Sequence, residues 1–323
     1  MRLEQVAVIG AGAWGTALAQ AAAMAGRDVT LVARDRAVIE EINRQHRNRA
    51  YLGEMPLHGR LGASDRSDGT ADLVILAVPA QASRAALVQA AEALAGKPVV
   101  LSAKGLETGT LLRQSEILAE TVPSARPFVL SGPSFAADVA AGRPTAVTLA
   151  GGVPAMTEAV AAALAGPSFR PYAAGDVLGV ELAGALKNVY ALASGAVDGA
   201  ALGASARSAL IARAFAELSR MIVAAGGEAS TLTGLAGIGD LTLSCTSTQS
   251  RNYRYGAALG RGETPAGELA EGVATAPVAQ AMARRLGIEA PLVDAVNLLL
   301  DGRASIDQIV GGLMSRPLRR EDD

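Results

Sequence analysis

The sequence predicts an α/β protein, with a Rossmann-like, doubly wound, mostly parallel sheet followed by an all-α C-terminal domain. In the first half, short apolar runs alternate with Ala-rich stretches of helical length. Continuous apolar runs are typical of parallel strands covered on both faces. After about Gly175 these runs give way to helical patterns. Since single cores seldom exceed about 250–300 residues, the 323 residues predict two domains, 1–175 and 176–323.

The strands of the first domain are expected at its apolar runs, and their alternation with helices indicates βαβ units. These runs are Val6–Ile9, Val29–Val32, Arg60–Ala63, Leu73–Val78, Pro98–Ser102, Phe128–Leu130, Ala146–Ala150 and Phe169–Tyr172. The helices of the second domain are expected at Val177–Ser194, Ser205–Ala225, Asn252–Leu259, Val273–Leu286, Leu292–Leu300 and Ser305–Leu313. Gly226 and Gly302 are predicted to end helices, because glycine readily adopts the left-handed conformation found there.

Composition narrows the class of protein. A net charge of −2 argues against a broad basic surface for nucleic acid. The single Cys245, expected to be a buried small residue, excludes an internal disulfide framework and fits a reducing compartment. No apolar stretch has the length of a signal peptide or membrane span, so we expect a cytoplasmic protein without membrane insertion. The apolar helical domain favours a homodimer.

No metal site is expected from the two histidines. His46 and His58 lie in a polar region without the spacing of metal ligands, and both are predicted to be surface residues.

A glycine motif predicts a dinucleotide site. The run Gly10-Ala11-Gly12-Ala13-Trp14-Gly15 is a G-x-G-x-x-G that follows a predicted strand and opens a predicted helix. In this context Gly10 permits a tight turn, Gly12 lets the backbone approach a pyrophosphate, and Gly15 lets helix and strand pack closely. The N–H groups and the dipole at the helix start favour an anion.

The choice of dinucleotide is expected to be made where the second strand ends, at Ala33-Arg34-Asp35. Arg34 suits the 2′-phosphate of NADP(H), whereas an acid at this place binds the ribose hydroxyls of NAD(H). Because Arg34 comes first, we expect NADP(H), while Asp35 leaves NAD(H) open.

Topology predicts one crevice for the ligand. In a doubly wound sheet, ligands bind beyond the carboxyl ends of the strands at the point where the strand order reverses. The residues just past the predicted strand ends are Gly10, Pro79, Lys104 and Gly132. Lys104 is the only charged residue of this set. A surface lysine in a loop is the alternative, which its position after an apolar strand disfavours.

Lys187 is the candidate acid/base of the helical domain. Its neighbours three and four residues away share its helix face, and three of the four are small (Ala183, Gly184 and Ala191, with Tyr190). A substrate could approach the amine closely in such a notch. A lysine can serve as acid and base if burial and a neighbouring cation lower its pKa from about 10.4. The alternative is a lysine whose stem packs while its amine stays in water.

Two further segments carry polar groups. Gly237-Ile238-Gly239-Asp240 is expected to form a tight loop that presents Asp240. If Asp240 lies close to Lys187, it would orient that lysine. The run Ser247–Asn252 is expected to open a short helix, and its hydroxyls, Arg251 and helix N–H groups would together bind a phosphate. A turn-forming Asp and a plain helix cap are the alternatives.

Taken as a set, the motifs resemble those of the bacterial-type NAD(P)-dependent glycerol-3-phosphate dehydrogenase family, in the family's order and over most of the chain. The matching stretches are Gly10–Thr16 (GAGAWGT), Ala77–Pro79 (AVP), Ala103–Leu106 (AKGL), Ser131–Ala136 (SGPSFA), Gly184–Tyr190 (GALKNVY), Gly234–Asp240 (GLAGIGD), Gln249–Asn252 (QSRN) and Glu271-Gly272 (EG).

The resemblance implies a role for each matching residue. Lys187 would be the proton acceptor, and Lys104 would contact both substrate and cofactor. The substrate and its phosphate would be bound at Gly132, Ser134, Asp240, Ser250, Arg251 and Asn252. The cofactor would contact Ala13, Trp14, Arg34, Lys104, Ala136, Arg251 and Glu271. The product would supply phospholipid synthesis, which the resemblance alone implies.

Three stretches depart from the family's pattern. Ala13 stands where members often carry Ser, so one hydrogen bond to the pyrophosphate is expected to be lost. The stretch Asn48–Glu54 lacks the proline that often follows Tyr-Leu, and Arg60–Thr70 matches nothing in the family. None of the three is expected to touch the chemistry.

Two rival functions remain open at the level of sequence. A β-hydroxyacid or 6-phosphogluconate-type dehydrogenase would need a carboxylate pocket, whereas Ser250–Asn252 suits a phosphate. A non-catalytic NADP-binding sensor would bind cofactor without turnover, and the presence of Lys104, Lys187 and Asp240 together disfavours it.

Overall fold

The computed structural model describes residues 3–67, 69–265, 270–315 and 317, and the chain forms two compact units. The first unit comprises Met1–Ala185 with Ala225–Asp240, and the second comprises Leu186–Ala224 with Leu241–Asp323. The first unit thus includes a few residues that follow Gly175 and a segment from within the helical half. The division of the chain into domains 1–175 and 176–323 stays a prediction.

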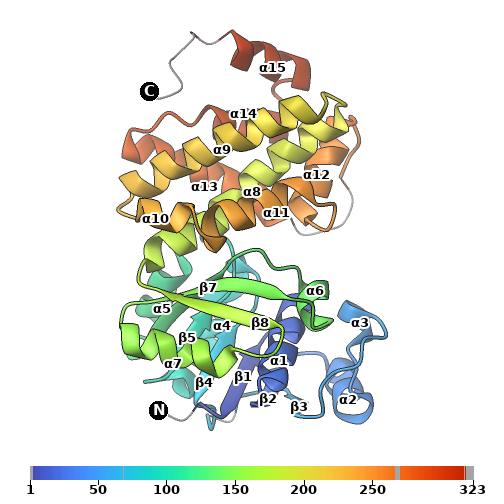
Figure 1. The fold of residues 1–323 in the computed structure, drawn as a ribbon, viewed down its shortest axis with the longest axis vertical. Coiled ribbons are helices and arrows are strands. Elements are labelled where there is room, and N and C mark those ends of the chain that lie inside the picture. Colours follow the sequence, from blue (N-terminus) through green and yellow to red (C-terminus); the bar gives the residue numbers. More distant parts are fainter. Residues whose placement is uncertain (1–2, 68, 266–269, 316, 318–323) are drawn as a thin grey trace. The chain divides into compact units, whose positions relative to one another are not determined.

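The first unit contains one eight-stranded sheet in the order β3-β2-β1-β4-β5-β6-β7-β8. The first six strands in this order, from β3 to β6, are parallel, and β7 pairs antiparallel with β6. Strand β8 pairs parallel with β7 (Figure 1, both in green). The order 3-2-1-4-5-6 is that of doubly wound dinucleotide-binding sheets. The strands are β1 Gln5–Ile9, β2 Asp28–Val32, β3 Leu61–Ser64, β4 Leu73–Leu76, β5 Pro98–Leu101, β6 Arg126–Ser131, β7 Thr145–Gly151 and β8 Phe169–Ala174. All eight predicted strands and the mostly parallel sheet are confirmed.

Helices cover both faces of the sheet. Successive residues of a strand point to opposite faces, and in these strands the residues on both faces are apolar. Val6 and Val8 point into a core shared with α1, α6 and α7, whereas Ala7 and Ile9 point into a core shared with α4 and α5. The helices of the sheet region are α1 Ala13–Met24, α2 Arg36–Gln45, α3 Arg49–Leu52, η1 Ala80–Ala82, α4 Ser83–Leu94, α5 Gln114–Thr121, α6 Ala136–Ala140 and α7 Pro154–Leu164. The two-sided core explains the continuous apolar runs of the sequence.

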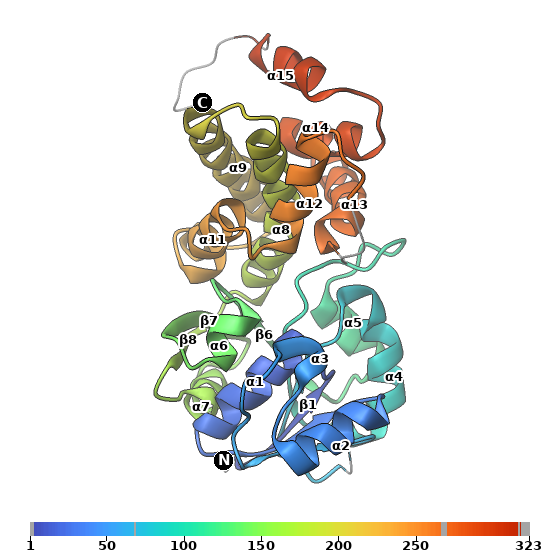
Figure 2. The ribbon, with the colours of Figure 1, turned by 90° about the vertical axis from the view of Figure 1, so that its right-hand side faces the viewer.

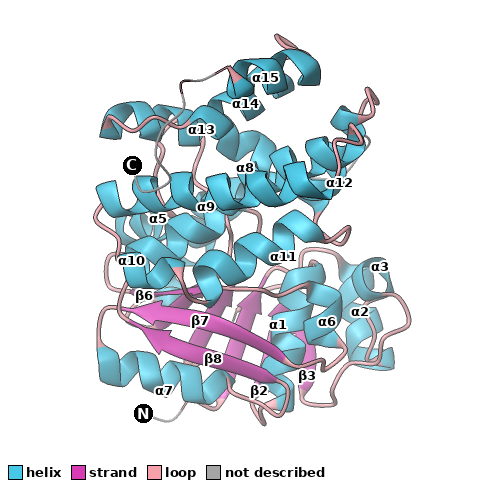
Figure 3. Cartoon of the chain, turned by 45° about the horizontal axis from the view of Figure 1, so that its top comes forward, coloured by secondary structure: helices cyan, strands magenta, loops and turns pink. Residues whose placement is uncertain are grey.

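The described part of the second unit consists of helices joined by loops and contains no strand (Figure 3, helices in cyan). Its helices are α9 Ala204–Ala224, α12 Arg251–Gly260, α13 Glu271–Leu286, α14 Pro291–Leu300 and α15 Ile306–Met314, together with most of α8 Val177–Gly199 and of α11 Asp240–Thr246. Gly226 and Gly302 follow helix ends with φ of 97° and 65°, as predicted. Among the described residues, no helix is long and apolar enough to span a bilayer.

The expected tight loop at Gly237–Asp240 is wrong. Leu235–Gly239 forms a turn of π-helix, η2, and Asp240 is the first residue of α11. A Cβ at Gly237 would overlap with the carbonyl group of Leu232 in α10, Ala229–Leu232. Gly237 therefore allows a compact helical turn against α10 rather than an exposed loop, and π-turns of this kind are frequent at functional sites.

Glycines bring α8 and α12 into backbone contact within the second unit. A Cβ at Gly195 would overlap with the carbonyl oxygen of Tyr253, and one at Gly256 with that of Leu192. Gly199 and Gly260 make equivalent approaches one turn further along. The close packing fixes the position of α12 on α8, which is the helix that carries Lys187.

Candidate active site

The glycine turn has the geometry that the motif predicts. Gly10 has a φ of 112°, and a Cβ there would lie 2.7 Å from the oxygen of Ala77. A Cβ at Gly15 would overlap with the oxygen of Gly10, so this glycine allows the close packing of α1 on the turn. By contrast, apart from its chain neighbours and its own helix, no described residue comes within 4 Å of the Cβ position of Gly12. The turn is therefore tight at Gly10 and Gly15 and open at Gly12.

The start of α1 offers free hydrogen-bond donors. Its N-cap residue Gly12 has no side chain to cap the first turn, and that turn contains no acid. Ala13 and Trp14 are the first two helical residues. Since the first N–H groups of a helix have no partner within the helix, they can bind an anion. These observations fit the pyrophosphate of a dinucleotide.

The end of β2 places Arg34 and Asp35 in different situations. Asp35 is the N-cap of α2, and its Oδ1 accepts a hydrogen bond of 2.8 Å from the N–H of Ala37. Arg34 is exposed and forms no ion pair with any residue that the structure describes. The carboxylate of Asp35 therefore already caps α2, whereas the guanidinium of Arg34 forms no ion pair within the described part of the chain.

Lys104 and Asp240 form a pair in the first unit, although 136 positions separate them in the sequence. The Nζ of Lys104 donates to Oδ2 of Asp240 at 2.7 Å and to the oxygen of Gly132 at 3.0 Å. The side chain of Asp240 is 1% exposed and that of Lys104 is 14% exposed. Ser134 donates to the same oxygen of Gly132 at 2.9 Å. Four predicted substrate-site residues from three segments thus meet at one point.

Glycine is needed at two positions near these residues, Gly132 and Gly184, because neighbouring atoms approach closely there. Gly132 has a φ of 136°, and a Cβ there would come within 3.0 Å of the Cα of Val147. A Cβ at Gly184 would lie 2.6 Å from Oγ of Ser131 and 3.6 Å from Cγ of Lys104. Gly132 therefore allows the turn to pack closely on β7, and Gly184 allows α8 to pack closely on Ser131, beside the Lys104 side chain. Ala136, a predicted cofactor contact, begins α6, which packs on α1.

The loop after Lys104 is held by polar contacts on both sides. Arg84 donates to both oxygens of Glu107, at 2.8 and 2.9 Å, and lowers the pKa of that carboxyl. Glu181, buried in the first part of α8, accepts from the N–H and hydroxyl of Ser115, and burial raises the pKa of Glu181. These contacts limit how far the loop and Lys104 can move.

Lys187 is buried in the second unit, with 6% of its surface exposed. Its Nζ donates a hydrogen bond of 2.6 Å to Oγ of Ser244 on α11. Ser244 is itself buried. The amine therefore does not lie in bulk water, and the hydroxyl fixes its direction.

Next to Lys187, two asparagines join three helices. Nδ2 of Asn252 donates to Oδ1 of Asn188 at 2.9 Å, and Oδ1 of Asn252 accepts from the N–H of Gly272 at 2.9 Å. The three residues belong to α8, α12 and α13, and they come from three of the matching motifs. Glu271, the first residue of α13, is half-buried beside this link. The amide of Asn252 is thus partly engaged within the protein.

The residues predicted to bind the phosphate lie at the start of α12. Ser250 is its N-cap and accepts from the N–H of Tyr253 at 3.3 Å, as the predicted helix opening requires. Arg251 is exposed and makes no ion pair within the described residues. Its guanidinium is therefore available to an anion.

His46 and His58 are exposed and Cys245 is fully buried, as predicted. Over the described residues, no group of three or more His, Cys, Asp or Glu side chains could hold a metal ion.

Sequence reasoning missed Ser244 and Asn48. Ser244 lies four residues after Asp240, so both share one face of α11, and that spacing was the available signal. Asn48 is fully buried and donates to the oxygen of Ala11 in the glycine turn. Asn48, the first residue of the stretch Asn48–Glu54, therefore contacts the candidate cofactor turn, while the expectation that this stretch stays away from the chemistry itself remains a prediction.

Two family models match the chain. Residues 5–157 match the model described as NAD-dependent glycerol-3-phosphate dehydrogenase N-terminus, and residues 176–311 match the C-terminus of the same family. Together these matches cover most of the chain, including every motif that resembles the family.

Proteins with similar sequences are also described as glycerol-3-phosphate dehydrogenases. A glycerol-3-phosphate dehydrogenase [NAD(P)+] of Brucella ovis is 49% identical over 98% of this chain and 99% of its own length. One of Caulobacter vibrioides is 48% identical over 99% and 100%. The crystal structure of glycerol-3-phosphate dehydrogenase from Coxiella burnetii matches with a TM-score of 0.89 and 35% identity, covering 97% of this chain and 99% of the other.

Proposed function

Because the chain belongs to the NAD-dependent glycerol-3-phosphate dehydrogenase family, we propose that it interconverts glycerol 3-phosphate and dihydroxyacetone phosphate. The observation that carries the proposal is the pairing of two lysines with hydroxyl or carboxylate partners: Lys187, which is buried, with Ser244, and Lys104, whose side chain is 14% exposed, with Asp240. Both lie in motifs that the sequence assigns to the reaction.

The glycine turn would hold the dinucleotide. The open space at Gly12 and the N–H groups at Ala13, Trp14 and Gly15 suit its pyrophosphate. Arg34 would bind a 2′-phosphate, and Ala136, Glu271 and Arg251 would make further contacts. When bound, the nicotinamide supplies or accepts the hydride at C2 of the substrate.

Lys187 would move the proton. In the direction of carbonyl reduction, its ammonium donates a proton to the alkoxide oxygen that forms at C2, and in alcohol oxidation its neutral amine accepts that proton. Ser244 keeps the amine directed, because a hydrogen bond of 2.6 Å between two buried groups leaves little rotational freedom. Burial also keeps water from competing for the proton.

The substrate would be bound at two places. Lys104, Gly132 and Ser134 would bind its hydroxyl or carbonyl end, with Asp240 holding the Lys104 amine in place. The start of α12, with Ser250, Arg251 and Asn252, would bind the phosphate. A guanidinium next to the N–H groups of a helix start is well suited to a phosphate dianion.

Several of these residues follow one another along two helices. Gly184 lies against Lys104, and Lys187 follows one turn later on α8. In the same way, Ser244 follows Asp240 by one turn on α11. The residues proposed for one reaction therefore occur in pairs on the same helices.

Other properties follow from sequence and are proposed here on that basis. NADP(H) is the expected preference, with NAD(H) also accepted. The location is the cytoplasm, the product supplies phospholipid synthesis, and the helical unit mediates a homodimer.

The test is an absorbance assay of nicotinamide oxidation with dihydroxyacetone phosphate, run with each reduced dinucleotide. We expect turnover with the triose phosphate. In the reverse direction, with each oxidised dinucleotide, we expect no turnover of 3-hydroxyacids or 6-phosphogluconate. Turnover with those acids instead would support the rival dehydrogenase, and dinucleotide binding without any turnover would support the sensor. Lys187→Met should bind dinucleotide as the unmodified protein does but lose turnover.

A further inference from the structure

Asn48 occupies an unexpected place for a residue of an otherwise polar connecting segment. It is fully buried, and the segment between α2 and α3 that carries it lies beside the start of α1 (Figure 2). Nδ2 of Asn48 donates to the oxygen of Ala11 at 3.1 Å and to Oγ1 of Thr16 at 2.8 Å. The two hydrogens of one amide nitrogen account for both bonds.

The bond to Ala11 concerns the direction of a carbonyl group within the glycine turn. A turn that binds a pyrophosphate must present N–H groups to it, and a carbonyl oxygen facing the anion would repel it. Asn48 draws the Ala11 oxygen into the protein interior, and the hydroxyl of Thr16 also contacts that oxygen at 3.4 Å. Both partners are fully buried.

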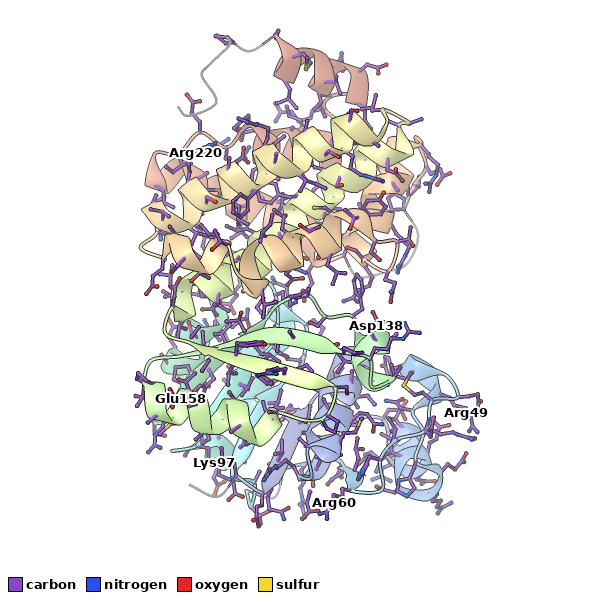
Figure 4. All side chains as sticks on the ribbon, viewed as in Figure 1. Arg49, Arg60, Lys97, Asp138, Glu158 and Arg220 are labelled. Carbon is purple, nitrogen blue, oxygen red and sulfur yellow. The ribbon has the colours of Figure 1, made fainter. Side chains whose placement is uncertain are left out.

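The segment around Asn48 is itself firmly anchored. The N–H and guanidinium of Arg49 donate to Glu41 at 3.0 and 2.8 Å, and its Nε donates to Glu54 at 2.7 Å (Arg49 is labelled in Figure 4). The N–H of Leu57 bonds to the oxygen of His46 at 2.7 Å. The residues around Asn48 are therefore hydrogen-bonded both to α2 and to the residues that follow α3.

We propose that Asn48 is a positioning residue for the dinucleotide, which fixes the glycine turn in its anion-binding conformation by holding the Ala11 carbonyl. The inference rests on the proposed function, because it assumes that the turn binds NAD(P)(H). Since the pyrophosphate is common to both dinucleotides, Asn48 affects NADH and NADPH equally and does not choose between them.

The chain offers a matched control. Gln20, on α1, is also a buried amide, and it joins this helix to the segment between α3 and β3, with Nε2 donating to the oxygen of Pro56 at 3.4 Å and Oε1 accepting from the N–H of His58 at 2.8 Å. The side-chain hydrogen bonds of Gln20 within the described residues do not involve the glycine turn. Asn48→Leu and Gln20→Leu therefore both remove a buried amide, but only the first releases the Ala11 carbonyl.

The experiment measures dissociation constants of NADH and NADPH by fluorescence titration, without substrate, for both variants and the unmodified protein. For Asn48→Leu we expect both constants to rise about tenfold, since about 1.4 kcal/mol of anchoring corresponds to that factor. With saturating dinucleotide, kcat and the KM for dihydroxyacetone phosphate should stay within about twofold. Gln20→Leu should lower the unfolding temperature and leave both dissociation constants within about twofold.

Three results would overturn the inference: unchanged dinucleotide binding by Asn48→Leu, equal weakening by Gln20→Leu, or a change that affects only one of the two dinucleotides. Should Asn48→Leu not fold, Asn48→Ala removes the same donor without adding bulk and is compared in the same way. If the unmodified protein binds neither dinucleotide, the proposed function fails; if it binds them and the Asn48 variants do too, only the inference fails.

Discussion

The ammonium nitrogen of Lys187 lies 2.6 Å from the hydroxyl oxygen of Ser244, and both side chains are buried. Ser244→Ala should lower kcat by about tenfold, because the amine loses the partner that directs it. Lys187→Met should lower kcat by about 10²–10⁴-fold, the usual contribution of general acid–base catalysis. Steady-state kinetics checks both values. Ser244→Thr, which keeps a hydroxyl, should restore most of the rate, and a kcat unaffected by Ser244→Ala would remove this residue from the mechanism.

The ion pair of Lys104 and Asp240 should stabilise the first unit only while both partners are present. Asp240→Asn leaves a nearly buried ammonium without its charge partner, and breaking such a pair costs roughly 3 kcal/mol. Lys104→Met combined with Asp240→Asn should cost clearly less than the costs of these same two changes made singly and added together. Denaturant unfolding of the four proteins gives the coupling energy, and strictly additive costs would show that the ion pair has no such coupling.

Arg34 should decide between the dinucleotides. Arg34→Ala removes an exposed guanidinium at the end of β2 that forms no ion pair with any residue described by the structure. We expect the dissociation constant of NADPH to rise about tenfold or more, since hydrogen bonds to charged groups contribute about 1.5–3 kcal/mol, and that of NADH to change less than about twofold. Fluorescence titration measures both. Equal weakening of the two would place Arg34 away from the 2′-phosphate.

Gly256 should tolerate no side chain. Its Cβ position overlaps with the carbonyl oxygen of Leu192, a backbone atom that cannot rotate away. Gly256→Ala should therefore cost about 1–3 kcal/mol, the usual range for overpacking, as measured by denaturant unfolding. Gly311 in α15 is the matched control, because nothing lies within 4 Å of its Cβ position. Gly311→Ala should be neutral or stabilise by up to about 1 kcal/mol, and equal effects at both sites would contradict the close contact of α8 and α12.

Glu217 should make stability depend on pH. Its carboxyl accepts from the N–H groups of Leu292 and Val293 at 3.0 Å each, at the start of α14, and burial raises its pKa. A raised pKa means that the folded protein holds this proton more tightly than the unfolded chain. The contribution of Glu217 is thus complete below its pKa in the unfolded chain and declines as pH rises through the folded value.

Glu217→Gln removes this titration. The unfolding free energy of the unmodified protein should therefore fall relative to that of Glu217→Gln as pH rises from about 4.5, the usual value for a glutamate. Denaturant unfolding at intervals from pH 4 to 8 measures it. A difference that is constant over this range would show that Glu217 titrates alike in both states.

The sheet could be predicted from sequence because its strands carry a strong local signal. Val6–Ile9 and Leu73–Leu76 are continuously apolar, and the glycine motif fixes the order of strand, turn and helix at Gly10–Gly15. The same topology brought Lys104 and Gly132 to one edge, and the structure confirms that they lie in hydrogen-bond contact.

What sequence could not supply is the pairing of residues that are far apart in the chain. The contact of Lys104 with Asp240, the anchoring of Lys187 by Ser244 and the burial of Asn48 depend on packing between distant segments. The π-turn before Asp240 was missed for a related reason. Glycine-rich stretches usually indicate loops, and only the neighbouring α10 backbone shows why glycine is needed in a helical turn there.

The chain of amides from Asn188 through Asn252 to the N–H of Gly272 has a practical consequence for engineering. An amide that donates on one side and accepts on the other has no single-residue substitute of equal size, since aspartate lacks the donor and leucine lacks both groups. A chimaera that exchanges the segment containing α12 must therefore carry a compatible residue at position 188. Libraries that randomise positions 188 and 252 should vary them jointly, because most single replacements would leave the other amide buried without its partner.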